Sequence, residues 1–154
     1  MKQPNDRGFT LVEVIVVVAI LGILSGVVSL SLNQVSAGKL RKFTAACDAM
    51  LTRCRVETLS GAGADTYVEL RLEDGRCAVR FCRNGETEDE EILRCPAPCT
   101  YTLNGTETAL TASAPLRLSF DRTTGALNES CTEINISGSV ISLAPATGYH
   151  RRGG

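Results

Sequence analysis

Seven cysteines offer the most obvious chemistry in this sequence, because a thiol can form a disulfide or bind a metal ion. No CxxC pair occurs, and the single histidine, His150, lies near the C-terminus, so the ligand spacing of a zinc site is missing. We therefore expect disulfides in an oxidising compartment, with at least one cysteine that is unpaired or pairs with another chain. The alternative is that several are buried thiols that pack as small hydrophobic side chains. The seven are Cys47, Cys54, Cys77, Cys82, Cys95, Cys99 and Cys131.

A second chemical feature is the carboxylate of Glu13, at the entrance of the apolar stretch "RGFTLVEVIVVVAILGILSGVV" (residues 7–28). No polar side chain occurs between Val14 and Leu24. A carboxylate at the centre of a membrane helix costs ~2.5–3.5 kcal/mol, and less near its end. Glu13 therefore requires an explanation, and the usual one is a positively charged partner.

The element that carries Glu13 is predicted to be a membrane helix. Residues 14–32 form a run of 19 residues interrupted only by small or weakly polar side chains. As a helix this run spans about 28 Å, close to the ~30 Å of a hydrocarbon core, and it is too long for a buried strand. Gly22 and Gly26 have the spacing that lets a second membrane helix approach closely. The general frequency of glycine in such helices explains them equally well.

Three interpretations of the N-terminus follow from the residues. A secretory signal would be cut after the apolar run, near "QVSAGK" (residues 34–39), and a plain membrane anchor would not be cut. The third interpretation places the cut before the run. The basic residues Lys39, Arg41 and Lys42 follow the run, so a positive-inside count alone would put the N-terminus outside.

The third interpretation comes from a family resemblance. "GFTLVE", Gly8 to Glu13, resembles the prepilin signature of type IV pilins and type II secretion pseudopilins. The resemblance implies that a prepilin peptidase removes the leader (residues 1–8) and N-methylates Phe9. It also implies that Glu13 pairs with the new α-amine of a neighbouring subunit. Such a pairing explains the acid at position 13. The resemblance also implies a cytoplasmic leader and an extracytoplasmic C-terminal domain, which is the opposite of the orientation that the positive-inside count alone would give.

The partners that the resemblance implies are other pilins or pseudopilins, the prepilin peptidase/N-methyltransferase, an inner-membrane assembly platform, and the lipid bilayer before assembly. The assembly helix would cover residues 9–32. An amphipathic continuation is expected over residues 33–60, because apolar side chains recur at steps of three and four up to the glycines of "SGAGAD". Its stripe consists of Val28, Leu32, Val35, Leu40, Phe43, Cys47, Met50 and Cys54.

Residues 65–154 are predicted to form an antiparallel β domain, which makes the fold class α+β and pilin-like. "YVELRLEDGRCAVRF" predicts a hairpin with Asp74-Gly75 as its turn, so that Leu70 faces Val79 and Glu69 faces Arg80. A second hairpin is predicted in "INISGSVISL", with Gly138-Ser139 as the turn and Ile136 opposite Ile141.

Other segments of the domain give weaker predictions. "PLRLSF" reads as a strand, "NG" at residues 84–85 and 104–105 predicts turns, and the acidic "ETEDEE" (residues 86–91) predicts a solvated loop. "CPAPC" (residues 95–99) reads as a loop whose cysteines join neighbouring strands, because proline cannot donate to a sheet. "LSFDRTTGAL" and the ending "PATGYHRR" resemble H-type pseudopilins and FimT-like minor pilins.

No catalytic motif is present, so we expect a structural subunit of a pilus or pseudopilus, with no enzymatic activity and no cofactor. His150 is expected to be an exposed tail residue. One alternative function is DNA capture by a minor pilin of a competence system, with Arg151 and Arg152 as the contacts, although the net charge of −1 gives no sign of nucleic-acid binding. The other alternative is a plain membrane-anchored or secreted β domain.

Overall fold

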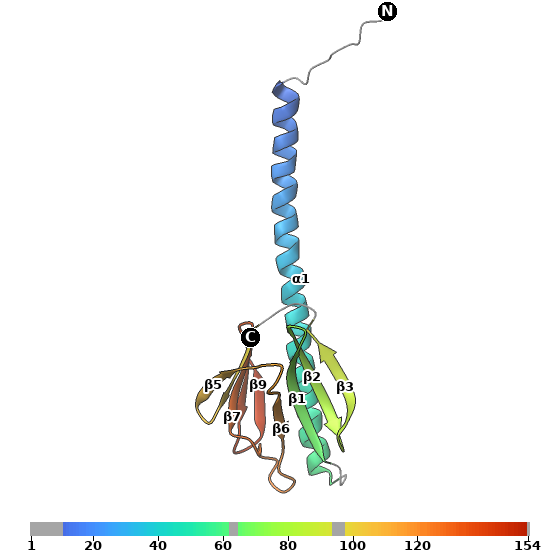
Figure 1. Ribbon diagram of the computed structural model, residues 1–154, viewed down its shortest axis with the longest axis vertical. Helices are drawn as coiled ribbons and strands as arrows, with labels where there is room; N and C mark the ends of the chain where they lie inside the picture. Colours follow the sequence, from blue (N-terminus) through green and yellow to red (C-terminus); the bar gives the residue numbers. More distant parts are fainter. Residues whose placement is uncertain (1–10, 62–64, 94–97, 154) are drawn as a thin grey trace, which may run out of the picture. The chain divides into compact units, whose positions relative to one another are not determined.

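The computed structural model describes residues 11–61, 65–93 and 98–153, and it describes the side chains of these residues outside 22–36. The chain forms two compact units, residues 1–37 and residues 38–154. The long helix α1 (Leu11–Leu59) contributes its N-terminal part to the first unit and its C-terminal part to the second. Figure 1 shows the second unit as this last part of α1 together with two sheets.

Nine strands are seen among the described residues, and all of them pair antiparallel. The sheet orders are β3-β2-β1-β6 and β5-β4-β7-β8-β9. The α+β class and the antiparallel pairing are therefore confirmed, and the strands of the domain are divided between two sheets. The strands are β1 (Thr66–Glu73), β2 (Arg76–Arg83), β3 (Glu86–Ile92), β4 (Cys99–Leu103), β5 (Thr106–Ala109), β6 (Leu116–Ser119), β7 (Cys131–Ile136), β8 (Ser139–Ala144) and β9 (Tyr149–Arg152).

The hairpin of β1 and β2 has the predicted register. Leu70 lies opposite Val79 and Glu69 opposite Arg80, and the turn residues Asp74 and Gly75 both have positive φ, 49° and 73°. Although Glu69 faces Arg80 as predicted, its carboxylate accepts a 2.7 Å hydrogen bond from Arg117 on β6, which is the other neighbour of β1.

The register predicted for the hairpin of β7 and β8 is wrong by two residues. The turn is Ser137-Gly138, so Ile134 lies opposite Ile141 and Ile136 opposite Ser139. Both turn residues have positive φ, 51° and 88°, and the Asn135 side chain accepts a hydrogen bond from the Gly138 amide. A two-residue hairpin turn of type I′ needs positive φ at both central positions. A shift of two leaves every side chain on its predicted face, which is why the apolar pattern did not reveal the error.

The acidic segment predicted to be a loop is strand β3. It follows the predicted turn at Asn84-Gly85 and pairs with β2, with Glu90 opposite Arg80. Its carboxylates contact cations on both sides: Arg80 on β2, and Lys42 and Arg53 on α1. The prediction for Cys99 also changes, because Cys99 begins strand β4, whereas residues 95–97 of the predicted loop lie outside the described residues.

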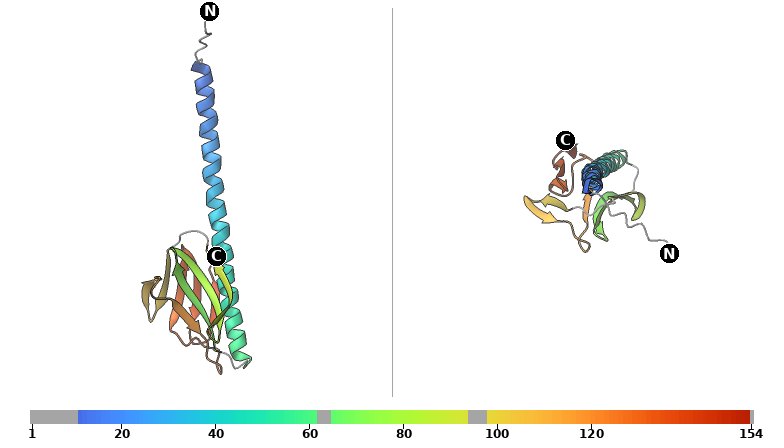
Figure 2. Two further views of the ribbon diagram at one scale, coloured as in Figure 1. Left: turned by 45° about the vertical axis from the view of Figure 1, so that its right-hand side comes forward. Right: turned by 90° about the horizontal axis from the view of Figure 1, so that it is seen from above.

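One hydrophobic core joins the C-terminal part of α1 to both sheets. Of the predicted helical stripe, Phe43, Cys47, Met50 and Cys54 are buried, and Leu40 is partly buried. Val28, Leu32 and Val35 have side chains outside the described set. The core also takes Val68, Leu70, Val79 and Phe81 from the first sheet and Ile134, Ile136 and Ile141 from the second. Figure 2 shows both sheets beside this part of the helix.

Arg55 of α1 holds two loops of the domain together. Its Nε donates to the carbonyl of Gly125 (3.1 Å) and its Nη2 to the carbonyl of Thr147 (2.9 Å). The two loops meet closely at Gly148, where a Cβ atom would lie 1.8 Å from the Gly125 carbonyl oxygen. The segments "DRTTG" and "PATG" therefore have a structural role, which is to dock the loops after β6 and β8 against the helix.

Candidate functional site

Glu13 lies in the first turn of α1 and is exposed, as are all described side chains from Leu11 to Leu21. The large apolar side chains of this segment are between 50% and 75% exposed. An acid is favoured at the N-terminus of a helix by the helix dipole, so the position of Glu13 suits the isolated helix. The apolar side chains around it are unfavourable in water, and contiguous exposed apolar surface of this kind marks a membrane or protein interface. They are Leu11, Val12, Val14, Ile15, Val16, Val17, Val18, Ile20 and Leu21.

The other residues predicted for processing and assembly are not positioned by the structure. Gly8 and Phe9 lie outside the described residues, and Gly22 and Gly26 belong to the helical backbone of α1 within the stretch whose side chains are not described. Among the parts of α1 with described side chains, no stretch is long and apolar enough to span a membrane. Of the predicted membrane segment, residues 9–32, only residues 11–21 have described side chains.

The six described cysteines are free thiols and all are buried, which matches the alternative expectation of small hydrophobic side chains; Cys95 lies outside the description. Burial raises the pKa of Cys54 and of Cys131 to about 11, and it raises the pKa of Cys47 further. Thiols with raised pKa values stay protonated at neutral pH and are poor nucleophiles. Among the described residues no group of three metal-ligating side chains occurs.

Cys77 and Cys99 differ from the other cysteines because the two side chains shift each other's pKa in opposite directions. Interaction with Cys99 and burial raise the pKa of Cys77, whereas interaction with Cys77 lowers the pKa of Cys99. The sequence alone could not single out this pair, since it contains seven cysteines and the two lie on strands of different sheets.

His150 is not an exposed tail residue, and this prediction is wrong. It lies on strand β9, its side chain is only 8% exposed, and its Nε2 is 3.0 Å from the Thr52 hydroxyl and 3.6 Å from Asp48 Oδ1. Both of these partners are on α1. The polar ending of the sequence thus forms an edge strand that packs against the helix, and the pairing of β9 with β8 is what places it there.

Arg151 and Arg152, the candidate DNA contacts, are exposed on the same edge strand. Neighbouring residues of a strand point to opposite faces. The two guanidinium groups therefore do not converge on one surface by virtue of their spacing, and this arrangement adds no support to a nucleic-acid interface.

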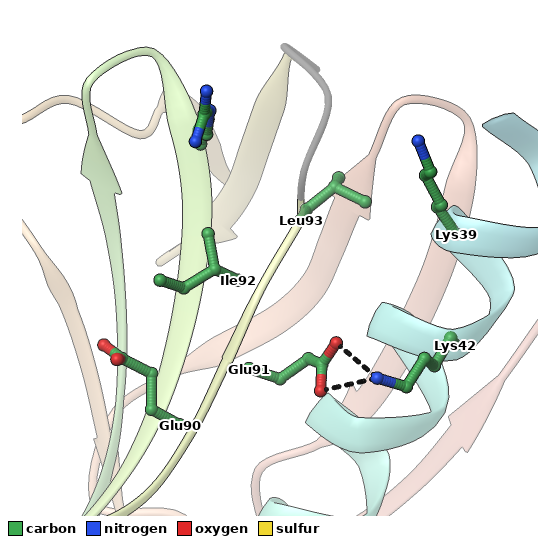
Figure 3. Close-up of a pocket in the computed structure, with 7 residues that line it drawn as sticks. Lys39, Lys42, Glu90, Glu91, Ile92 and Leu93 are labelled. Carbon is green, nitrogen blue, oxygen red and sulfur yellow. Dashed lines mark hydrogen bonds and ion pairs between the residues drawn. The ribbon is translucent and has the colours of Figure 1, made fainter.

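An open groove of about 850 Å³ lies between the start of the C-terminal part of α1 and the first sheet (Figure 3). Its lining includes Lys39, Lys42, Arg76, Glu90 and Glu91. Lys42 Nζ donates to both carboxylate oxygens of Glu91, at 2.9 and 3.1 Å, so one of the cations is already neutralised. The mixed charge favours a polar contact with another protein surface over a site for a single anion or cation.

Comparison with known families identifies one match. Residues 3–29 match the family described as "Prokaryotic N-terminal methylation motif". No curated protein and no solved structure matches the chain. The matched residues contain the processing signature and Glu13, and the motif supports a precursor of the type IV pilin or pseudopilin class, which a prepilin peptidase would process.

Proposed function

We propose that this protein is a minor structural subunit of a type IV pilus or of a type II secretion-like pseudopilus. The peptidase cuts between Gly8 and Phe9 and methylates the new N-terminus, and the subunit then enters the filament through the N-terminal part of α1. The single observation that carries the proposal is the methylation motif at residues 3–29, which overlaps a helix with an acid in its first turn and exposed apolar side chains around it.

The physical argument starts from the exposed segment Leu11–Leu21. Its apolar side chains need lipid or other helices as their surroundings, and both environments have a low dielectric constant. In such surroundings the carboxylate of Glu13 requires a cation. Cleavage after Gly8 would create one, the α-amine of Phe9, and a staggered neighbour would bring that amine beside Glu13. The attraction is stronger where water is excluded.

The assignment as a minor subunit, of the H-type pseudopilin or FimT-like kind, is supported by the C-terminal resemblance in "LSFDRTTGAL" and "PATGYHRR". In the structure these segments supply the loops that Arg55 holds. The proposal includes a single-pass topology with a cytoplasmic leader and an extracytoplasmic domain. A DNA-capturing minor pilin and a plain membrane-anchored β domain remain the alternatives.

Processing is tested by expressing the full chain with and without a prepilin peptidase and determining the N-terminus of the product. We expect a start at methylated Phe9 only when the peptidase is present. A start near Gly38 would identify a conventional signal peptide, and a chain that keeps Met1 in the presence of the peptidase would identify a plain anchor. Either result overturns the proposal.

Assembly is tested by Glu13→Gln, which removes the charge and keeps the size of the side chain. We expect normal insertion and cleavage, but incorporation into filaments that is lower by about a hundredfold or more, because breaking a buried ion pair costs about 3–5 kcal/mol. Quantitative immunoblotting of sheared filaments measures the amount of each variant that is incorporated. Asp6→Asn is the matched control, since it removes a carboxylate from the leader. Normal incorporation of Glu13→Gln would show that the acid serves only the helix N-terminus.

A further inference from the structure

A basic cluster of three side chains lies at the end of the domain where the C-terminal part of α1 begins. Lys39 and Arg41 are exposed on the helix, and the exposed Arg76, the first residue of β2, lines the same groove as Lys39. Figure 3 shows Lys39 on the helix turn before Lys42, apart from the contacts that join Lys42 to Glu91. None of the three basic side chains forms an ion pair with another described residue.

The acids at this end of the domain are held by other cations. Glu73 and Glu90 are both bound by Arg80, and Glu91 is bound by a lysine of α1. Asp74 is exposed in the turn before β2, and within the described part of the chain it has no cation partner. Three unpaired cations against one unpaired acid leave this surface with an excess of two positive charges.

The chain keeps the basic cluster close to the apolar run that precedes it. Lys39 is seven residues after Leu32, the last residue of the predicted membrane segment. Seven residues span at most about 25 Å even when the chain is fully extended. A bilayer that holds the apolar run therefore presents its headgroups to the basic cluster at a high effective concentration, because the two are tethered.

A surface of many headgroups suits the basic cluster better than one bound ion does. The mixed charge of the groove leaves no enclosed site for a single anion, whereas a layer of lipid phosphates gives each exposed cation a headgroup of its own. Each basic side chain close to an anionic membrane surface strengthens binding by about fivefold. In the proposed topology the cluster lies on the extracytoplasmic side, where basic residues are less common, and contact with lipid gives them a role.

We propose that Lys39, Arg41 and Arg76 hold this end of the domain against the headgroups of anionic phospholipids before the subunit enters a filament. The membrane location rests on the proposed function, whereas the choice of residues rests on their exposure and their unpaired charges. The contact is reversible and weakens with salt, because exposed charges are screened beyond about 8 Å at physiological ionic strength. A subunit leaving the bilayer therefore exchanges it for contacts with other subunits.

The test measures which lipids the full chain retains. The chain is purified in an uncharged detergent, mixed with equal amounts of phosphatidylglycerol and phosphatidylcholine that carry the same acyl chains, and analysed by native mass spectrometry. We expect phosphatidylglycerol to be retained in preference to phosphatidylcholine by about twentyfold, as an excess of two positive charges implies. High salt added before the measurement should reduce this preference.

Variants at exposed positions locate the contact without disturbing the core. Lys39→Gln with Arg76→Gln removes the charge excess and should bring the ratio of the two retained lipids close to one. Arg151→Gln with Arg152→Gln is the matched control, because it removes the same charge from β9 and should keep the preference. Asp74→Asn removes the unpaired acid and should raise the preference by about fivefold.

Three results would overturn the proposal. The first is equal retention of the two lipids by the wild type. The second is an equal loss of preference in the Arg151 and Arg152 variant, which would show that net charge rather than the basic cluster is responsible. The third is displacement of phosphatidylglycerol by inorganic phosphate at the concentration of the lipid, which would indicate a site for a free anion.

The outcome is separate from that of the proposed function, because the test uses the uncleaved chain and needs no filament. A chain that is cut after Gly8 in cells but retains both lipids equally would refute the lipid contact and leave the proposed function intact. A chain that retains phosphatidylglycerol but is never cut would refute the proposed function alone.

Discussion

The N-terminal and C-terminal parts of α1 share a secondary structure and differ in what their side chains contact. From Leu11 to Leu21 the apolar side chains surround the helix and are exposed. From Gly38 to Leu59 they form one stripe, in which Phe43, Cys47 and Leu51 are almost fully buried. Polar residues spaced between the apolar ones make the second part amphipathic, so it can pack on a domain. The first part, apolar on every side, needs lipid or other helices.

The C-terminal part also makes specific polar contacts with both sheets. Lys42 and Arg53 bind the carboxylates of β3, and the Arg53 guanidinium lies 4.2 Å above the ring of Phe81 on β2. Thr52 and Asp48 contact His150 of β9. This part of the helix is therefore a structural element of the domain, and the N-terminal part is the one that we propose enters the filament.

The sharpest test of this difference compares Leu51→Ala with Ile20→Ala. Leu51 is fully buried, so its truncation should lower the free energy of unfolding of the domain by about 2–5 kcal/mol. Ile20 is 51% exposed, and its truncation should change that free energy by less than about 0.5 kcal/mol. Urea unfolding of the full chain in detergent, followed by tyrosine fluorescence, measures both, since all three tyrosines lie in the domain. Equal effects would show that the two parts of the helix do not differ as described.

Gly148→Ala should break the docking of loops onto Arg55. The new Cβ would lie 1.8 Å from the Gly125 carbonyl oxygen, and the residue has φ of +64°. The backbone at Gly125 or Gly148 must therefore move, and we expect this overpacking to lower the free energy of unfolding by about 3 kcal/mol. Gly138→Ala is the matched control, because it also has positive φ, +88°, but nothing within 4 Å of the added Cβ. It should cost only about 1 kcal/mol of backbone strain. Thermal unfolding of both variants distinguishes the clash from the strain.

Glu57→Gln tests the smallest of these effects, the charge contacts between α1 and the first sheet. Arg83 and Arg53 donate hydrogen bonds to the Glu57 carboxylate, and they hold its pKa below the ordinary value of 4.5. The contribution of Glu57 to stability is therefore complete above about pH 4.5 and is lost as the pH falls through the lowered pKa. The variant should lose up to about 1 kcal/mol at pH 7, since the partners are partly exposed.

The pH dependence supplies the control for this prediction. The difference in unfolding free energy between the wild type and Glu57→Gln should shrink when the urea titration is repeated below pH 4.5. Glu107→Gln, at a carboxylate that accepts a hydrogen bond from the Thr100 hydroxyl, should show little difference at either pH. A Glu57→Gln deficit that is constant with pH would mean that packing, rather than charge, is responsible.

The two predicted hairpins show how far a sequence pattern reaches. For β1 and β2, the turn Asp74-Gly75 and the alternating side chains agree on one register, and that register is observed. For β7 and β8, the apolar pattern allows registers that differ by two residues. The choice depends on which pair takes positive φ, and the side chain of Asn135 favours Ser137-Gly138 by accepting from the Gly138 amide. A local hydrogen bond thus decides what the apolar pattern leaves open.

The sequence by itself determined the features that depend on neighbouring residues. Helical periodicity predicted the buried stripe of α1, the Asn-Gly and Asp-Gly pairs predicted turns, and the spacing of Gly8, Phe9 and Glu13 indicated the processing motif. These signals are local because backbone conformation depends mainly on adjacent residues. Only the tertiary structure decided that the acidic segment is strand β3 and that His150 packs on the helix. Each of these contacts joins distant residues, and it exists because packing one core against α1 brings separate strands together.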